Sequence, residues 1–193
     1  RHTVKPNNTD RDRGPRSTED TQTDFTSLNV LGSIPAPTTA IDATLESGFQ
    51  FNNGLRVGNG DGVLLVGGEC FSWRPWLGSA SEDKGGNVEG EGNDSKKEEL
   101  KMRMVNRKGQ FEVDESVWGL LGIVWPRPDL LIVGTGSSII PLSLETRKHI
   151  NAHGVRVEVL DTRNAAAQFN LLATERGVSE IAAALIPIGF EGR

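Results

Sequence analysis

The sequence predicts an α/β protein with three layers around a mixed sheet, and two observations lead to this fold class. Between residues 48 and 76, short apolar segments alternate with Asn-Gly, Asp-Gly and Gly-Gly pairs. This pattern is typical of antiparallel strands joined by tight turns. From residue 114 onward, apolar runs alternate with helical segments, which is typical of strands connected by helices. We therefore expect antiparallel N-terminal strands followed by a strand-helix-strand-helix-strand unit.

Composition narrows the classes of protein that fit. The chain has 193 residues, enough for one domain with a hydrophobic core. Its formal net charge of −5 argues against nucleic-acid binding, because phosphate contacts need surfaces rich in Lys and Arg. Cys70 is the only cysteine, so neither an intrachain disulfide nor a cysteine-based metal cage can form. The lack of a disulfide is consistent with a protein of a reducing compartment. No apolar run in the sequence approaches the roughly 20 residues of a membrane span.

The N-terminal part divides into two segments that lack the pattern of a folded core. Residues 1–24 carry almost no apolar side chains and predict a flexible tail. Acidic residues are spread through this tail, so it is not a mitochondrial transit peptide, although it could follow a cleaved one. Since the chain begins with Arg1 and not with Met, we expect a processed or trimmed product. Residues 25–47 contain Pro35 and Pro37 and predict an extended arm lying on a surface.

A single α/β domain is expected over residues 48–187, with a short tail at 188–193. The stretch at 78–99 consists mainly of Gly, Ser and charged residues and predicts a mobile insertion between antiparallel strands. The strand pattern resumes over residues 100–107.

Helix signals open the C-terminal half of the domain. Residues 114–124 begin with an acidic cap and carry apolar residues at helical spacing, and the prolines that follow should end this helix. The apolar run at 129–134 predicts a buried strand. In "PLSLETRKHINAHG", Ser143 is the expected N-cap and Gly154 the expected C-cap of a second helix.

Three further segments complete the unit. "VRVEVLDT" alternates like a strand with one wetter face, "TRNAAAQFNLLATERG" predicts a helix with Ala and Leu on its inner side, and "IAAALIP" predicts a last buried strand. Because crossover connections are right-handed, the last three strands should be parallel neighbours.

The stretch "DLLIVGTGSSIIPLSLETRKHI" raises the question of whether its glycine pair binds a nucleotide. Gly134-Thr135-Gly136 lies between a strand and a helix, and Asp161 ends the next strand, where a ribose-binding acid would lie. However, Ile139 occupies the position of the third glycine, and Pro141 delays the helix, so its N–H groups would not point at a bound phosphate. We interpret Gly134-Thr135-Gly136 as a structural turn and Asp161 as an N-cap.

Other candidates for chemistry have simpler interpretations. His149 and His153 lie four residues apart on one helix and could bind zinc, but no third ligand is near them in the sequence. Cys70, Ser72 and Ser137 are candidate nucleophiles, but no G-x-S-x-G motif frames the serines, and the sequence assigns no base to any of the three. Cys70 fits better as a small buried hydrophobic residue.

Tryptophans beside prolines suggest a binding surface. Trp73 and Trp76 flank one proline, and Trp125 precedes another, at positions where tryptophans are often partly exposed. Such residues are favoured anchors at protein interfaces, whereas the alternative is that they cover the edge of the core. The predicted partner interface consists of Trp73 and Trp76 with Ile34, Pro35 and Pro37 of the arm.

Several segments of the chain resemble a known family. They are "PRPDLLIVGTG", "HGVRVEVLDTRNAAAQFNLLATERG" and "AAALIP", with the earlier "GFQFNNGLRV" and Trp73. This is the small α/β family that includes mitochondrial complex I assembly factor 3, and the resemblance covers about 48–76 and 117–187. The chain resembles a fungal-type member with a low-complexity insertion. The insertion and the long turn "TERGVSE" depart from the family pattern. The most specific pieces are Gly134-Thr135-Gly136, Val157-Glu158-Val159, Asp161-Thr162, Phe169-Asn170 and Ala183-Ala184-Leu185-Ile186-Pro187.

The resemblance implies a three-layer α/β fold and a non-enzymatic role without a cofactor. Such proteins help to build the matrix arm of NADH:ubiquinone oxidoreductase, so the implied partners are complex I assembly factor 4 and quinone-module subunits. The implied location is the mitochondrial matrix, peripheral to the inner membrane. The alternative is a small-molecule-binding or enzymatic domain that uses the cleft at the strand ends near Thr135, Ser137 and Asp161.

Overall fold

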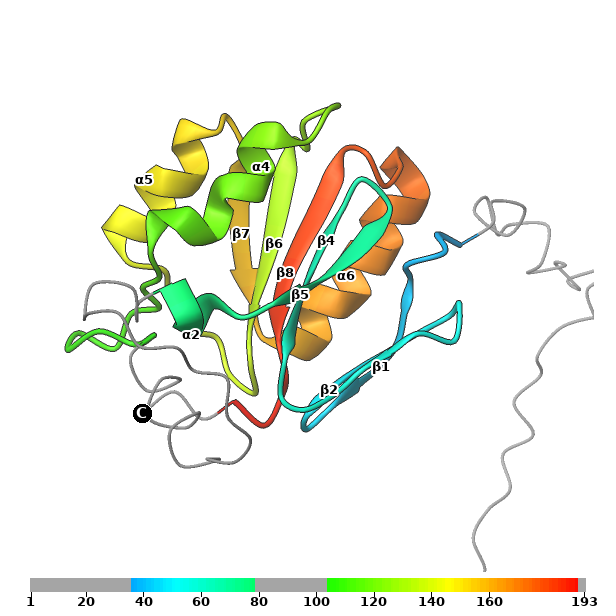
Figure 1. Ribbon diagram of the computed structural model, residues 1–193, viewed down its shortest axis with the longest axis horizontal. Coiled ribbons are helices and arrows are strands. Elements are labelled where there is room, and N and C mark those ends of the chain that lie inside the picture. Colours follow the sequence, from blue (N-terminus) through cyan, green and yellow to red (C-terminus); the bar gives the residue numbers. More distant parts are fainter. Residues whose placement is uncertain (1–35, 79–103, 191–193) are drawn as a thin grey trace, which may run out of the picture. The chain divides into compact units, whose positions relative to one another are not determined.

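A computed structural model describes residues 36–78 and 104–190 of the chain, and these residues form two sheets and several helices (Figure 1). The three-stranded sheet has the order β1 (Ile41–Leu45), β2 (Gly48–Phe51) and β3 (Arg56–Val57). The five-stranded sheet has the order β5 (Glu69–Trp73), β4 (Gly62–Val66), β8 (Ile181–Ile186), β6 (Leu130–Thr135) and β7 (Arg156–Leu160). The helices are α2 (Pro75–Gly78), η1 (Glu115–Trp118), α4 (Gly119–Ile123), α5 (Leu144–Ala152) and α6 (Thr162–Arg176).

The five-stranded sheet is mixed, as the sequence predicts. β4 pairs antiparallel with β5 and β8, whereas β6 pairs parallel with β7 and β8. β4 and β5 form a hairpin whose two turn residues, Gly67 and Gly68, both have positive φ angles, the geometry that suits the right-handed twist of a hairpin. The predicted fold class is therefore confirmed, with antiparallel N-terminal strands and a C-terminal strand-helix-strand-helix-strand unit.

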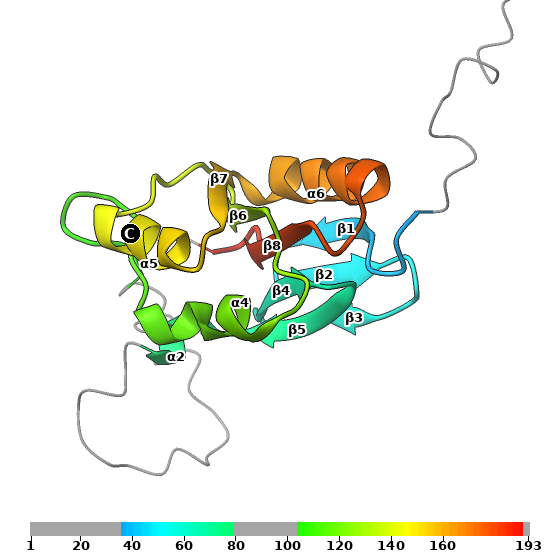
Figure 2. The same cartoon turned by 90° about the horizontal axis from the view of Figure 1, so that it is seen from above.

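Two apolar clusters hold the layers together, one on each face of the five-stranded sheet. α6 and the small sheet cover one face, while α4 and α5 lie on the opposite face (Figure 2). Alternation along β8 divides its side chains between the faces, so Ala182 belongs to the α4 side and Ala183 to the α6 side. Because both faces are covered, β8 is buried over its whole length.

The predicted N-caps are confirmed by hydrogen bonds. Asp114 accepts from the backbone N–H of Ser116, and Ser143 accepts from that of Thr146. Asp161 accepts from two backbone N–H groups at the start of α6. These side chains satisfy donors that the first turn of a helix leaves without intrahelical partners. The segment expected as one helix over 114–124 is divided, because a 3-10 turn, η1, leads into the short α4.

Two segments differ in detail from the expectation. Residues 41–45, inside the segment expected to be an extended arm, form β1 and pair with β2. The prediction of a strand over 100–107 is wrong for residues 104–107, the part that the structure describes, because Val105 makes only an isolated bridge with Phe111. The reason is local: the Asn106 side chain accepts hydrogen bonds from the N–H groups of Lys108 and Gln110 and closes a turn there.

Several expectations fall outside the described residues. They concern the tail at 1–24, the arm residues Ile34 and Pro35, nearly all of the insertion at 78–99 and the last three residues of the tail at 188–193. Within 36–78 and 104–190, none of the helices has the length and apolar character needed to cross a membrane.

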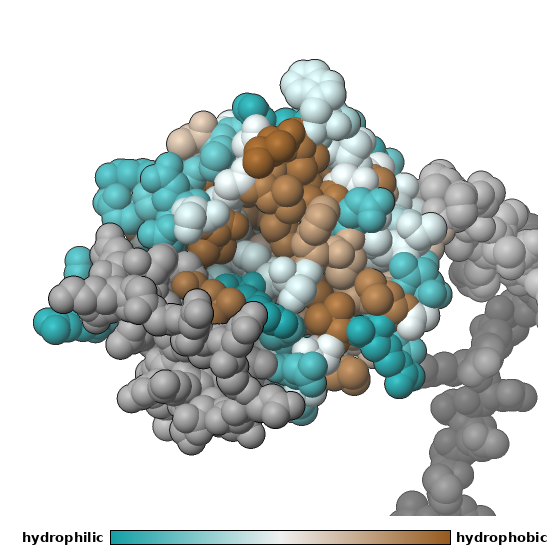
Figure 3. Space-filling model, in the orientation of Figure 1, coloured by the Kyte–Doolittle hydropathy of each residue, from teal (hydrophilic) through white to brown (hydrophobic). Residues whose placement is uncertain are grey.

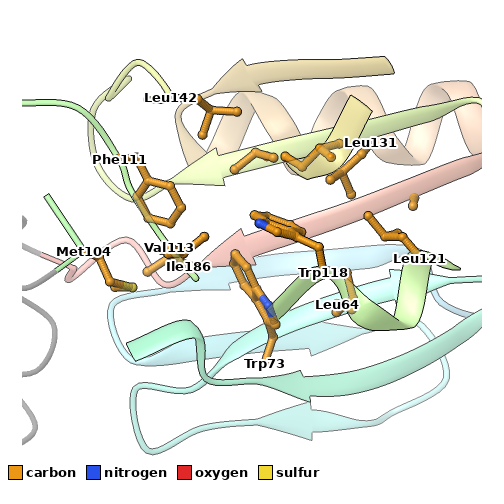
Figure 4. Packing of buried hydrophobic residues seen from close by; sticks show 14 of the residues in the cluster. Leu64, Trp73, Met104, Phe111, Val113, Trp118, Leu121, Leu131, Leu142 and Ile186 are labelled. Carbon is orange, nitrogen blue, oxygen red and sulfur yellow. The ribbon is translucent and has the colours of Figure 1, made fainter. Parts of the chain in front are cut away.

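The expected partial exposure of Trp73 and Trp76 is wrong. Their exposed fractions are 5% and 2%, and both belong to the cluster on the α4 face. Trp73 points inward because its position on β5 alternates onto that face, where its ring lies 5.5 Å from that of Trp118 (Figure 4). Trp125 is the tryptophan that fulfils the expectation, with 88% of its surface exposed. This burial supports the alternative interpretation, in which Trp73 and Trp76 cover the edge of the core. Their role at an interface stays a prediction.

Replacing Trp73 by Ala should therefore test packing. We expect Trp73→Ala to lower the free energy of unfolding by about 3–5 kcal/mol, because it removes a buried ring and leaves a cavity. Trp125→Ala is the matched control and should change it by less than about 0.5 kcal/mol, since that ring is exposed. Urea denaturation of both variants measures the difference. Equal stabilities would contradict the burial of Trp73.

Candidate functional site

The carboxyl ends of β6, β7 and β8 are where an α/β sheet usually binds a ligand. At this edge the chain leaves β6 through Gly136, whose φ angle of +98° favours glycine. A Cβ added to Gly136 would lie 3.1 Å from the backbone oxygen of Phe190, so the residue after β6 also has to be small. The glycine is thus required by backbone geometry and by a close neighbour.

One hydroxyl joins the three elements that meet at this edge. Thr162, the first residue of α6, is buried, and its Oγ1 accepts a hydrogen bond from the N–H of Gly136 at 2.9 Å. The same hydroxyl donates to the carbonyl of Ile186 at the end of β8. The Thr162 N–H donates in turn to the carbonyl of Gly136. The turn after β6, the end of β8 and the start of α6 are therefore fixed to one another.

The hydroxyl of Thr135 holds the rest of the turn. Its Oγ1 donates to the carbonyl of Ser138 and accepts from the N–H of Ile140, both at 2.9 Å. Thr135 is buried, whereas Ser137 is exposed at the bend of the turn. The hydroxyl that a nucleotide site would use is thus engaged in shaping the turn itself.

Asp161 is engaged in a similar way. Its carboxylate accepts hydrogen bonds from the backbone N–H groups of Arg163 and Asn164 and from the Asn164 side chain. Burial alone would raise the pKa of Asp161, but these hydrogen bonds outweigh that effect and lower the pKa below its ordinary value. The carboxylate is therefore ionised at neutral pH and occupies the helix end where a phosphate would bind.

The other candidates are not brought together into a site. The hydroxyl of Ser72 lies 3.5 Å from the Asp61 carboxylate, which also forms an ion pair with Arg74. Burial raises the pKa of Cys70 to about 11, so its thiol is protonated at neutral pH and is a poor nucleophile. Among the described residues, no group of three His, Cys, Asp or Glu side chains is placed to hold a metal ion.

An exposed apolar surface lies at the end of α4, which we call the α4 tip and define as Ile123 and Trp125. Their exposed fractions are 80% and 88%, high for large apolar side chains. Between them, Val124 approaches the hairpin turn, because a Cβ added to Gly67 would lie 3.8 Å from Val124 Cγ1. Figure 3 shows apolar side chains gathered on this face, from the end of α4 down across the β4–β5 hairpin. The signal in the sequence was a tryptophan beside a proline at the end of an element.

These features define a small three-layer α/β domain whose strand-end polar groups serve its own backbone and whose α4 tip is exposed. A family model described as "Protein of unknown function (DUF498/DUF598)" matches residues 41–186. The chain belongs to this family.

Curated relatives share part of this sequence. The chain is 46% identical over 68 residues to NADH dehydrogenase [ubiquinone] 1 alpha subcomplex assembly factor 3 of Xenopus tropicalis, covering 35% of this chain and 36% of the relative. It is 37% identical over 76 residues to the Homo sapiens protein of the same name, covering 39% and 40%. The aligned part therefore spans well under half the length of these relatives. A crystal structure described as an outer membrane protein from Bartonella henselae aligns with a TM-score of 0.49 at 16% identity, covering 79% of this chain and 98% of that chain.

The turn after β6 can be tested with a pair of glycine variants. Gly54 also has a positive φ angle, but a Cβ there would meet nothing within 4 Å, so Gly54→Val reports the backbone cost alone. Gly136→Val adds the contact with Phe190, and we expect it to be less stable than Gly54→Val by at least about 1 kcal/mol. Thermal unfolding of both variants measures the difference. A Gly136→Val protein as stable as the Gly54→Val protein but unable to act would instead support a ligand site.

The role of the Thr162 hydroxyl can be tested with an isosteric change. Thr162→Val should lower the free energy of unfolding by about 2–4 kcal/mol, because it leaves a buried N–H and a buried carbonyl without this partner. Thr174→Val, on the same helix, is the control; its hydroxyl donates to the carbonyl of Asn170 one turn earlier, and its loss should cost less than about 0.5 kcal/mol. Similar losses in chemical denaturation would show that the hydroxyl does not join the three elements.

Proposed function

We propose that this chain is a non-enzymatic assembly factor for mitochondrial respiratory complex I, NADH:ubiquinone oxidoreductase, and that it acts through protein–protein contacts. The observation that carries the proposal is the identity of 37–46% over 68–76 residues with proteins named as assembly factor 3 of this complex. The proposed partners are a second assembly factor, assembly factor 4, and subunits of the quinone module. The proposed location is the mitochondrial matrix, with peripheral association with the inner membrane through these partners.

The geometry of the strand ends supports a role without catalysis. A catalytic site at this edge would need a nucleophile or an acid–base group within reach of a substrate. Thr135, Asp161 and Thr162 instead form hydrogen bonds that shape the turn after β6 and the start of α6. These hydrogen bonds stabilise the fold, which supports a protein that acts through contacts on its surface.

The α4 tip supports a role in binding another protein. Trp is one of the residue types that contribute most to binding energy at interfaces, and an aliphatic neighbour extends the apolar area. Ile123 and Trp125 project from the end of a short helix whose inner face, through Leu121, is anchored in the core. The tip is thus an exposed apolar group beside an element that packs into the core.

A quantitative pull-down tests the proposal. The purified chain should capture complex I subunits from a mitochondrial extract, and native gels of cells without the protein should show less assembled complex I. The double change Ile123→Ala and Trp125→Ala should weaken capture by about thirtyfold or more, since truncating a central anchor typically costs about 2 kcal/mol or more. Circular dichroism should be unchanged because both side chains are exposed.

Leu171→Ala is the matched control for this experiment, because Leu171 is an exposed leucine on α6, on the opposite face of the sheet. It should capture the same subunits with unchanged affinity. Capture of no complex I subunit would contradict the proposed function. Equal capture by the double variant and the control would not contradict the proposed function, but it would show that the α4 tip is not the contact.

A further inference from the structure

β5 is an outer strand whose free edge is open among the described residues. It pairs with β4 on one side, and no other described strand pairs with it. Proteins usually block such an edge with Lys, Pro, a bulge or a covering segment, because unpaired backbone groups attract another strand. β5 reads Glu-Cys-Phe-Ser-Trp, with one charged residue, at its end, and it pairs with β4 without a register shift. The sequence of β5 therefore does little to prevent pairing.

The hairpin turn determines which backbone groups face the open edge. A two-residue turn at Gly67 and Gly68 makes Val66 and Glu69 the hydrogen-bonded pair that closes the hairpin. Hydrogen-bonded and non-bonded pairs then alternate along β5. The N–H and C=O groups of Cys70 and Ser72 accordingly point away from β4. They offer two donors and two acceptors to a second strand.

We propose that this edge pairs with the same edge of a second copy of the chain, antiparallel, with Phe71 opposite Phe71 of the second copy. Only this register places Cys70 opposite Ser72 twice and so uses all four outward groups of each strand. If the two-fold axis passed through Cys70 or through Ser72, only that residue of the two would lie opposite an outward-facing residue of β5 in the other copy. The edge is thus self-complementary about Phe71, as an interface with two-fold symmetry requires.

The side chains on the α4 face suit this register. Phe71 lies opposite Leu64 of the α4-side cluster and is 42% exposed, so the two phenylalanines would meet as a non-hydrogen-bonded pair, the closer type of cross-strand contact. Apolar groups are exposed at both ends of β5, with the α4 tip beside the hairpin turn and Leu77 on α2 beyond Trp73. The two-fold axis brings the α4 tip of each copy toward Leu77 of the other.

Charge does not oppose this arrangement. Glu69 begins β5 and is exposed, and in the proposed register it lies opposite Trp73 of the other copy. Arg74 follows β5 and pairs with Asp61 of its own chain on the opposite face of the sheet, so it is not a partner for Glu69. The two Glu69 residues are separated by four positions, about 13 Å along the strands. This self-association does not depend on the proposed role in complex I assembly.

Disulfide trapping tests the register in the full-length chain. In a Cys70→Ser background, Phe71→Cys places two thiols directly opposite each other, with Cα atoms about 4.5 Å apart, within the range of a disulfide. Oxidation by diamide should join more than half of the chains into dimers. Glu69→Cys in the same background is the control, because its thiols are separated by about 13 Å and should remain monomeric. Equal trapping at both positions, or none at Phe71→Cys, would overturn the proposal.

Sedimentation equilibrium measures the association without a covalent bond. Over about 1–500 µM, a range suited to small interfaces, the parent chain should change from monomer to dimer. Phe71→Lys places like charges opposite each other and should raise the dissociation constant at least about thirtyfold. Leu171→Lys is the control, because it makes the same kind of change, from apolar to positively charged, at an exposed side chain on α6. It should leave the dissociation constant unchanged. A parent chain that stays monomeric over the whole range would overturn the proposal and leave the edge to a different partner.

Discussion

The fold depends on β8, the strand that joins its two halves. β8 hydrogen-bonds to β4 in the antiparallel direction and to β6 in the parallel direction, so it links the N-terminal hairpin to the C-terminal unit. Three consecutive alanines, Ala182 to Ala184, keep it narrow on both faces. Small side chains there leave room for α6 on one face and for the large rings of the α4-side cluster on the other. A larger residue at these positions would have to displace a layer.

The fold could be predicted because its signals are local. Gly-rich turns, wholly apolar runs and caps such as Ser143 and Asp161 each act within a few residues, and each appears in the structure where it was expected. The errors arose where the decisive neighbour is distant in sequence. The burial of Trp73 depends on Trp118, 45 positions later by their residue numbers, and β1 depends on the Asn170 side chain, which hydrogen-bonds both backbone groups of Ile41.

The strand-end region shows the same limit. The sequence indicates a turn at Gly134-Thr135-Gly136, because the third glycine of a nucleotide fingerprint is replaced by Ile139. It does not indicate that Thr162, 26 residues later, supplies the hydroxyl that binds the turn. Such a contact forms only when parallel strands bring their carboxyl ends to one edge. A threonine that begins a helix looks in sequence like an ordinary helix residue, so no periodicity or motif distinguishes it.

The two proposed surfaces share residues, and this has a consequence for their use. Ile123 and Trp125 belong both to the surface proposed to bind complex I subunits and to the contact expected between paired β5 strands. A partner that covers the α4 tip would therefore compete with the second copy of the chain. Because self-association depends on the square of the chain's concentration, free chains would pair when partners are scarce and separate when partners are abundant. Pairing would then cover an open edge and an apolar tip that otherwise favour aggregation.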